Sequence, residues 1–192
     1  MRIIAGEWRG RRLKAPPGDA TRPTADRTRE TLFSMLASRL GSFEGLSVVD
    51  LFAGSGALGL EALSRGAAQC LFVEQDRAAI DTIRANIAML DCGRQSLVRA
   101  CSVLAMGPAD QPCDLALLDP PYGSGAANVA LDKLARLGWF APSTMIAVET
   151  GRKEAVSVEG FEILAERETG KARLTLLRAD SEFRAASTGP ES

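Results

Sequence analysis

From residue 47 onward, short apolar runs alternate along the chain with longer runs of helical periodicity. The runs at 47–52 and 70–74 have the length of buried strands, and residues 58–65 and 77–90 follow them with helical spacing. The last of these runs is predicted to bury one face, formed by Ile80, Ile83, Ile87 and Leu90. Since this order is typical of βαβ units, the sequence predicts a parallel sheet with helices packed against it.

The alternation continues as far as residue 179. The remaining predicted elements are strands at 96–100, 114–119 and 144–149, a helix at 127–137, and strands at 161–166 and 172–179. A short turn containing Gly170 joins the last two strands, so they are expected to pair antiparallel at the sheet edge. We therefore expect an α/β fold whose mostly parallel seven-stranded sheet has helices on both faces and its last strand inserted antiparallel.

The first 40 residues are predicted to form an N-terminal unit of their own. Residues 2–13 are consistent with a small β-ribbon around a glycine turn, which Pro16, Pro17 and Gly18 end. A helix is then expected at 25–40, because Leu32, Phe33, Leu36 and Leu40 share one helical face. The predicted domains are thus 1–40, a main domain at 41–180, and a flexible tail at 181–192 that is rich in Ser, Ala, Gly and Pro.

Composition excludes several kinds of catalytic site. The chain has no histidine, which rules out a Ser-His-Asp triad, a Cys-His dyad and histidine-ligated zinc. The four cysteines stand singly without a CxxC pair, so we expect reduced thiols and no metal site. No apolar run is long enough to span a bilayer and no signal segment opens the chain, so we expect a cytoplasmic protein without a membrane partner.

A glycine-rich segment runs from Asp50 to Gly59, between the first predicted strand and the next helix. Glycines permit positive φ angles and a helix N-terminus offers free N–H groups, a combination typical of nucleotide-binding loops. Gly54, Gly56 and Gly59 also match the dinucleotide fingerprint, with Glu74 20 residues beyond Gly54, so a nicotinamide-dependent oxidoreductase remains an alternative. Asp50 argues against that alternative, because its carboxylate suits a cationic ligand such as a methionine ammonium and would repel a pyrophosphate.

The segment Asp119-Pro120-Pro121-Tyr122 directly follows the apolar run 115–118. Paired prolines hold the backbone stiffly at the carboxyl end of a strand, where open α/β sheets bind their ligands. Such a segment suits the amino group of a nucleic-acid base. This amine is a poor nucleophile, because its lone pair is delocalised into the ring, until hydrogen-bond acceptors hold its N–H groups out of conjugation. Asp119 and the Pro120 carbonyl can supply two acceptors, and Tyr122 can stack on the base. The reacting nitrogen becomes acidic, so its proton can leave to Asp119 or water without a histidine.

Positive charge is concentrated near the N-terminus. Residues 1–29 hold eight Arg and Lys against three acids, a net charge of +5, which leaves −6 for the rest of the chain. A local positive face suits a polyanion that approaches from one side, and a solvated charged arm is the alternative reading. Trp8 lies among these arginines and is expected either to stack on a base or to pin the arm to the domain.

The chain resembles the bacterial family D of 16S ribosomal RNA (guanine-N2) methyltransferases of the small subunit. The resemblance covers nearly the whole chain. It is carried by the Arg-Ile-Ile-x-Gly-x-Trp-Arg-Gly segment at 2–10, the Arg-Pro-Thr-x-Asp-Arg-x-Arg-Glu-Thr-Leu-Phe segment at 22–33, the segment Phe52-Ala53-Gly54-Ser55-Gly56-Ala57-Leu58-Gly59, and Asp119-Pro120-Pro121-Tyr122.

The resemblance implies a Rossmann-like class I methyltransferase that uses S-adenosylmethionine. It places Thr24 and Phe33 near the methionine end of this cofactor and Glu74 at its ribose. The loop around the cofactor would comprise Asp50, Ala53, Gly54 and Gly56. The run after the third predicted strand departs from that of many relatives, so adenine recognition is assigned to Ser102 or to backbone groups.

The resemblance also implies a substrate and a partner. The substrate would be the N2 amine of one guanine in 16S ribosomal RNA, reached by an expected monomer in the small ribosomal subunit or its assembly intermediate. Asp119, Pro120 and Tyr122 would act on the flipped-out base, and RNA phosphates would contact Arg9, Arg11, Arg12, Lys14 and Arg22. Methylation of DNA adenine or protein glutamine, and a non-catalytic RNA-binding or assembly factor, remain alternatives.

Overall fold

The computed structural model describes residues 1–16 and 23–180. The predicted tail and Arg22 lie outside the described residues, and the side chain of Thr24 is also outside them. The helices are α1 (Pro23–Leu40), α2 (Ala57–Ser64), α3 (Arg77–Leu90) and α4 (Ala126–Arg136). The strands are β1 (Ser47–Leu51), β2 (Gln69–Glu74), β3 (Ser96–Ala100), β4 (Cys113–Leu118), β5 (Phe140–Gly151), β6 (Phe161–Thr169) and β7 (Ala172–Ala179), with short 3-10 turns η1 (Gly93–Gln95) and η2 (Val103–Ala105). None of the described helices is both long and apolar enough to cross a bilayer.

Helix α3 illustrates how local sequence sets an element. The Asp76 side chain accepts a hydrogen bond from the Ala79 N–H at 2.9 Å and so satisfies a donor that the first turn leaves unpaired. The helix ends at Asp91, whose backbone adopts the left-handed conformation. The predicted apolar stripe is buried along its whole length, as Ile80, Ile83, Ile87 and Leu90 show.

The seven strands form one sheet in the order β3-β2-β1-β4-β5-β7-β6. Strands β1 to β5 pair in parallel, and β7 lies antiparallel between β5 and β6, so the predicted sheet and its inserted last strand are confirmed. The chain builds outward from β1 through β2 to β3 and then returns to place β4 on the other side of β1. The carboxyl ends of β1 and β4 therefore form the topological switch point, where such sheets bind ligands.

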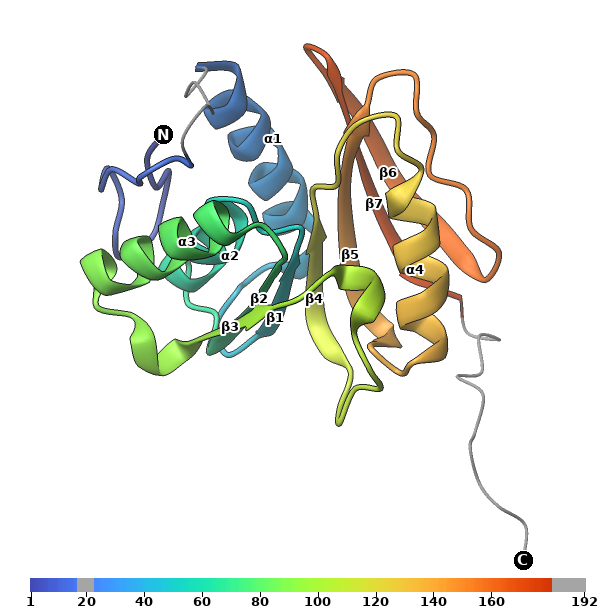
Figure 1. The fold of residues 1–192 in the computed structure, drawn as a ribbon. Helices are drawn as coiled ribbons and strands as arrows, with labels where there is room; N and C mark the ends of the chain where they lie inside the picture. The colour runs from blue at the N-terminus through green and yellow to red at the C-terminus, as the bar shows by residue number, and fades with distance from the viewer. Residues whose placement is uncertain (17–22, 181–192) are drawn as a thin grey trace, which may run out of the picture.

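Three helices cover one face of the sheet and α4 covers the other (Figure 1). Because side chains alternate along a strand, Val48 of β1 packs with α1, α2 and α3, whereas Val49 and Leu51 pack with α4. Asp50 lies between Val49 and Leu51, so its side chain points to the α2 side of the sheet, where it is fully buried. This alternation places a carboxylate beneath the glycine loop.

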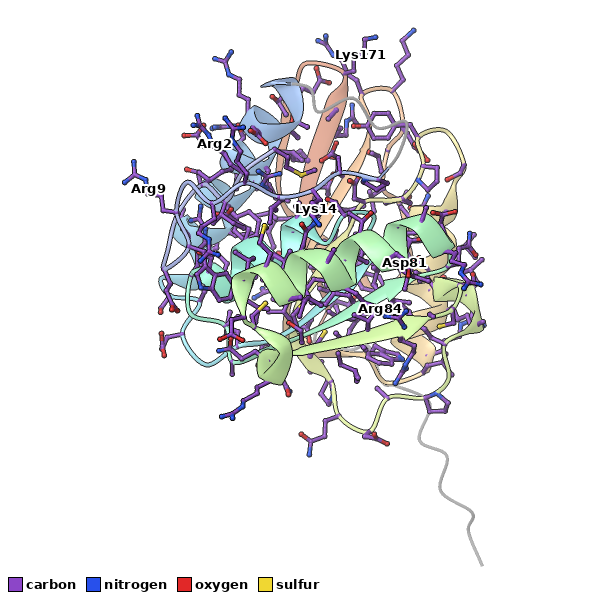
Figure 2. All side chains as sticks on the ribbon, turned by 60° about the vertical axis from the view of Figure 1, so that its left-hand side comes forward. Arg2, Arg9, Lys14, Asp81, Arg84 and Lys171 are labelled. Carbon is purple, nitrogen blue, oxygen red and sulfur yellow. The ribbon has the colours of Figure 1, made fainter. Side chains whose placement is uncertain are left out.

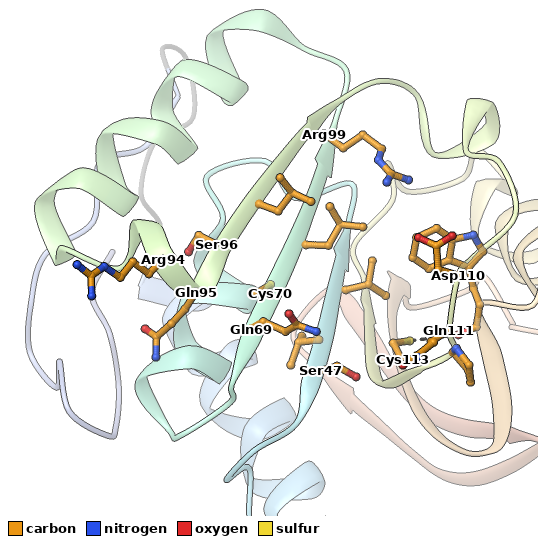
Figure 3. A pocket seen from close by; sticks show the side chains of 16 residues that line it. Ser47, Gln69, Cys70, Arg94, Gln95, Ser96, Arg99, Asp110, Gln111 and Cys113 are labelled. Carbon is orange, nitrogen blue, oxygen red and sulfur yellow. Dashed lines mark hydrogen bonds between the residues drawn. The ribbon is translucent and has the colours of Figure 1, made fainter.

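The half of the sheet formed by β1, β2 and β3 has no described helix on its α4 side, because η2 and a loop connect β3 to β4. A hollow of about 450 Å³ lies there, and Leu71, Leu97 and Arg99 are among the residues that line it (Figure 3). The Arg99 guanidinium lies over the Trp139 ring, 5.8 Å from its centroid. The hollow extends to the amino ends of the strands, away from the carboxyl ends at the switch point.

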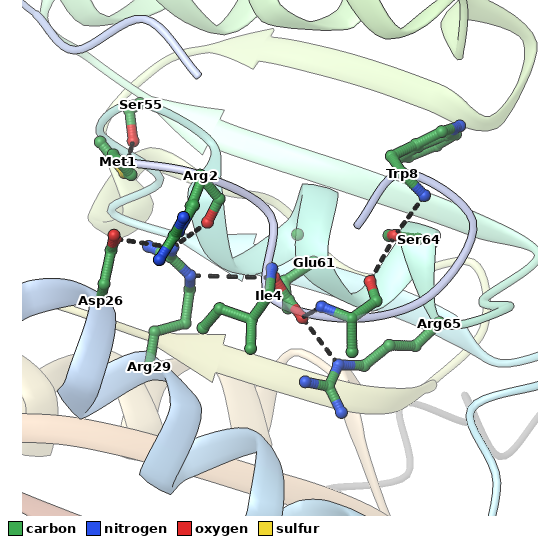
Figure 4. A network of polar contacts seen from close by, with 12 residues as sticks. Met1, Arg2, Ile4, Trp8, Asp26, Arg29, Ser55, Glu61, Ser64 and Arg65 are labelled. Carbon is green, nitrogen blue, oxygen red and sulfur yellow. Dashed lines mark hydrogen bonds and ion pairs between the residues drawn. The ribbon is translucent and has the colours of Figure 1, made fainter. Parts of the chain in front are cut away.

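The N-terminal β-ribbon is shorter than predicted, since Arg2 and Arg12 form a single antiparallel bridge. The Ile3 and Gly10 N–H groups still bond across the ribbon, to the Arg11 and Ile3 carbonyls. At the turn, N–H groups bond to helix α2 instead. The Ile4 and Ala5 N–H groups donate to the Glu61 carboxylate at 2.8 and 3.0 Å, and the Trp8 N–H donates to Ser64 Oγ at 3.0 Å (Figure 4).

The docked arm fits closely against α2. A Cβ on Gly6, whose φ is +85°, would lie 1.7 Å from the Ser64 carbonyl oxygen, so no larger residue fits. The fully buried Glu61 also accepts from Arg65 Nε at 2.9 Å. Trp8 is only 8% exposed and joins the core, which favours the reading that it pins the arm over the reading that it stacks on a base.

Candidate active site

A cleft of about 720 Å³ opens at the carboxyl edge of the sheet, at the switch point between β1 and β4. This volume is within the range of small-molecule and cofactor sites. The lining comes from the ends of β1, β2, β4 and β5 and from the segment around η2. It comprises Phe52, Gly54, Val73, Glu74, Gln75, Cys101, Ser102, Val103, Leu104, Asp119, Pro120, Pro121, Tyr122, Ser124, Ala126 and Glu149.

The glycine loop turns sharply from β1 into α2. Gly54 and Gly56 have φ angles of +56° and +79°, and Gly56 is the N-cap of α2. Phe52 has a φ of +60°, a conformation that is uncommon for a bulky residue and concentrates at functional sites. Gly59 is required for packing, because a Cβ there would lie 2.4 Å from the Phe72 ring.

Asp50 lies behind the glycine loop and is not part of the cleft wall. Its Oδ2 accepts the Gly59 N–H at 2.9 Å, and its Oδ1 has no hydrogen-bond partner among the described residues. Complete burial raises the pKa of Asp50 to about 8, and the Glu74 carboxylate adds to this rise. The buried Oδ1 is thus a polar position at the loop that a ligand or water can satisfy.

Glu74 stands at the end of β2 and lines the cleft, as expected of a ribose ligand. Its carboxylate already accepts the N–H groups of Gly54, Gln75 and Asp76 at 2.9, 2.7 and 2.9 Å. A carboxylate has about four lone-pair positions. In this arrangement Glu74 has room for about one more donor, so both ribose hydroxyls cannot bind without a rearrangement.

Of the other described residues predicted to bind the cofactor, some line the cleft and others do not. Ser102 lines the cleft, and its hydroxyl accepts the Leu104 N–H at 3.2 Å. Ala53 and Gly56 are buried within the glycine loop and do not line the cleft. Phe33 is fully buried beneath the Arg65 guanidinium, 4.8 Å from its ring centroid, so the structure does not bring it to the cleft.

The Asp119-Pro120-Pro121-Tyr122 segment lies in the cleft opposite the glycine loop, and all four residues line it. The Asp119 N–H donates to the Leu51 carbonyl at 3.3 Å, which ties this segment to the end of β1. Tyr122 is 49% exposed and lies against Gly151, where a Cβ would be 3.4 Å from the Tyr122 Cβ. The segment therefore presents a carboxylate and an open aromatic surface on one side of the cleft.

Glu149, at the end of β5, is a cleft residue that sequence reasoning missed. The Tyr122 hydroxyl donates to its Oε1 at 2.5 Å. Burial raises the pKa of Glu149, whereas the Tyr122 bond lowers it, and burial and this carboxylate together raise the pKa of Tyr122. An acidic residue at the end of the predicted strand 144–149 was the available signal, but only the strand order shows that it lies beside Asp119.

A second missed residue, Glu154, holds the loop that follows Tyr122. Its two carboxylate oxygens accept the N–H groups of Gly123 and Gly125 at 2.7 and 3.1 Å. These bonds lower the pKa of Glu154. The loop is therefore fixed at both ends, by Asp119 to β1 and by Glu154 to the segment after β5.

The basic residues predicted to contact RNA lie on the docked arm. Arg9, Arg11, Arg12 and Lys14 are exposed, and Figure 2 shows Arg9 pointing outward and Lys14 near α3. The backbone of Lys14 bonds twice to the fully buried Asn86, through Lys14 N–H to Oδ1 at 2.8 Å and Nδ2 to the Lys14 carbonyl at 3.0 Å. Asn86 Nδ2 also donates to the Ser55 carbonyl at 2.9 Å, so one side chain supports both the arm and the glycine loop.

Comparison with known proteins identifies the family. The family described as Conserved hypothetical protein 95 matches residues 1–178. The chain belongs to this family. It is 41% identical over 150 residues to ribosomal RNA small subunit methyltransferase D of Escherichia coli, covering 78% of this chain and 74% of that one. Against the Haemophilus influenzae protein of the same name it is 38% identical over 175 residues, covering 88% and 89%.

Solved structures agree with the architecture. The Escherichia coli protein yhhF matches with a TM-score of 0.80 and 36% identity, covering 94% of this chain and 98% of that one. A magnesium protoporphyrin IX methyltransferase from Synechocystis, solved with bound S-adenosylmethionine, shares the fold with a TM-score of 0.65 at 17% identity, covering 84% and 87%. The predicted family, class I methyltransferase fold and methyltransferase activity are confirmed, and the oxidoreductase alternative is not favoured.

Proposed function

We propose that this chain transfers a methyl group from S-adenosylmethionine to the exocyclic N2 amine of one guanine in 16S ribosomal RNA. The observation that carries the proposal is the single cleft between the glycine loop and the Asp119-Pro120-Pro121-Tyr122 segment. One side suits a nucleoside cofactor and the other suits a planar amine, so both reactants meet at one sheet edge. The relatives named ribosomal RNA small subunit methyltransferase D support the choice of substrate.

The residues of the glycine-loop side fit S-adenosylmethionine. Glu74 has room for a ribose hydroxyl, Leu104 offers an apolar surface that is 40% exposed, and Ser102 lies beside it. Behind this loop, the buried Asp50 Oδ1 has no hydrogen-bond partner among the described residues. When bound, the cofactor supplies an electrophilic methyl group on a sulfonium.

The remaining chemistry is performed by the side chains of the opposite wall. The Asp119 carboxylate and the Pro120 carbonyl accept the N–H groups of the base amine, which frees its lone pair for attack on the methyl carbon. The exposed face of Tyr122 stacks on the base and fixes its plane. As the new N–C bond would form, the methyl–sulfur bond would break to leave a neutral thioether, and the amine proton would pass to Asp119 or to water.

We further propose that the docked arm binds the RNA and positions it for this reaction. Arg9, Arg11, Arg12 and Lys14 are exposed and would neutralise phosphates near the flipped-out guanine. In this proposal the partner is the small ribosomal subunit or its assembly intermediate, and the chain acts as a cytoplasmic monomer.

Mass spectrometry of 16S RNA from cells with and without the gene tests the proposal. We expect one N2-methylguanosine to disappear on deletion and to return when deletion-strain particles are incubated with the purified protein and labelled cofactor. Small-subunit particles, free RNA, DNA and release factors are compared in the same assay. Incorporation only into DNA or protein would contradict the ribosomal substrate. Asp119→Ala is expected to abolish transfer while RNA affinity stays nearly unchanged, which separates an enzyme from a non-catalytic assembly factor.

A further inference from the structure

Two acidic residues lie at the carboxyl ends of neighbouring strands, at the reacting edge of the cleft. Strands β4 and β5 are parallel and pair Leu118 with Val148. Asp119, the first residue after β4, and Glu149, near the end of β5, follow this last pair. Leu118 and Val148 both pack in the α4 core, and both acidic residues line the cleft. Neighbouring parallel strands lie about 4.8 Å apart. The sheet register therefore brings two carboxyl groups side by side where the base amine reacts.

Glu149 has acceptor capacity beyond its bond to Tyr122. The Tyr122 hydroxyl has one hydrogen and donates it to Oε1, so this bond uses one of the two carboxylate oxygens. No other hydrogen bond of the Glu149 side chain is found among residues 1–16 and 23–180. Burial raises the pKa of Glu149 and the Tyr122 bond acts in the opposite direction. In its ionised form the carboxylate only accepts hydrogen bonds.

Two adjacent acceptors match the hydrogen-bonding edge of guanine. Guanine carries an amino group at C2 next to a protonated N1, so it presents neighbouring donors. In adenine and cytosine the amino group lies next to an unprotonated ring nitrogen, which is itself an acceptor. A second carboxylate beside the amine-binding group therefore attracts guanine and repels the other two amino-bearing bases.

We propose that Glu149 accepts the N1–H of the target guanine beside Asp119, and that this carboxylate pair makes the cleft select guanine over adenine and cytosine. The inference rests on the proposed function and adds to it the residue that reads the base. Tyr122 then has a second role besides stacking, because its hydroxyl orients the Glu149 carboxyl group.

A base analogue separates base reading from general activity. 2-Aminopurine keeps the amino group at C2 but has an unprotonated N1. It is placed by ligation into 16S RNA at the position that mass spectrometry identifies, and kcat/KM is compared with that of the guanine-containing RNA. We expect wild-type protein to prefer guanine by at least about 10-fold through this contact, as for a hydrogen bond to a charged group.

Glu149→Gln should reduce or invert this preference. The Tyr122 hydroxyl would bond to the amide oxygen and turn the amide NH2 toward N1, where it repels guanine and binds 2-aminopurine. If Glu149→Gln fails to fold, Glu149→Ala is tested in its place. The alanine side chain neither accepts nor donates a hydrogen bond, so the kcat/KM preference for guanine over 2-aminopurine should fall. Glu162→Gln, an exposed glutamate paired with Arg178, is the matched control and should leave the ratio unchanged.

Tyr122→Phe separates recognition of the base by Glu149 from stacking of the base on the Tyr122 ring. It removes the bond that orients Glu149 but keeps both carboxylates, so the preference for guanine should fall less than in Glu149→Gln, whatever the absolute rate. The inference is overturned if the Glu149 variants keep the wild-type ratio, or if Tyr122→Phe lowers the ratio as much as Glu149→Gln does. Wild-type protein that methylates guanine in no particle would instead overturn the proposed function, and with it this inference.

Discussion

Replacement of Asp50 by Asn tests how the carboxyl group buried behind the glycine loop makes the free energy of unfolding depend on pH. Asp50 is fully buried, and burial raises its pKa to about 8. In the unfolded chain the same group titrates near its ordinary pKa of about 3.9. Between these values the native state retains a proton that the unfolded chain releases, so a rise in pH favours unfolding. Linkage gives a loss of roughly 3 kcal/mol of stability between pH 5 and pH 8 from this one group.

The Asp50→Asn variant cannot release that proton. The difference in unfolding free energy between wild type and variant should therefore shift by roughly 3 kcal/mol in favour of the variant between pH 5 and pH 8. Urea unfolding at several pH values measures it, and other titrating groups largely cancel in the difference. Asp81→Asn, an exposed substitution on α3, is the control and should show no such trend. A wild-type-minus-variant difference that stays constant across this pH range would refute the assignment of Asp50 as a buried acid.

Three further predictions concern the arm. Gly6→Ala should cost about 2–4 kcal/mol in urea unfolding, since the new Cβ meets the Ser64 carbonyl at 1.7 Å and φ is +85°; a neutral effect would mean that the arm does not dock on α2. Asn86→Ala removes three hydrogen bonds and should lower the free energy of unfolding by about 2–4 kcal/mol. It should also weaken the binding of S-adenosylhomocysteine measured by calorimetry, and an unchanged affinity would argue against support of the glycine loop by Asn86. Reversal of Arg11 and Arg12 to Glu should weaken RNA binding and lower its salt slope by about 2; an unaltered slope would make the arm purely structural.

Much of the fold follows from sequence periodicity because the elements are long and strongly patterned. The stripe at Ile80, Ile83, Ile87 and Leu90 and the apolar run at 115–118 predict α3 and β4 at nearly their observed bounds. The N-terminal ribbon was the exception. Two of its backbone donors bond to Glu61 of α2, and no local pattern reveals a partner 56 or 57 residues away.

The candidate site was predicted unevenly for the same reason. Gly54, Glu74 and Asp119 belong to local motifs at strand ends, and the structure brings them to one cleft. Glu149 was missed because its significance depends on β5 lying next to β4, which follows from the strand order. Phe33 was assigned to the cofactor through the family resemblance, although its own helical stripe already predicted burial.

The placement of Asn86 links the two halves of the proposed reaction. Its amide holds the backbone of the basic arm at Lys14 and the glycine loop at Ser55, and it is fully buried between them. Buried amide hydrogen bonds are costly to leave unmade, so a displacement of the arm must either carry the glycine loop with it or break one of these bonds. RNA that draws the arm toward its phosphates therefore acts on the same side chain that supports the cofactor loop. Cofactor affinity should accordingly change when RNA is bound, and the change should be smaller in Asn86→Ala, where the shared support is absent.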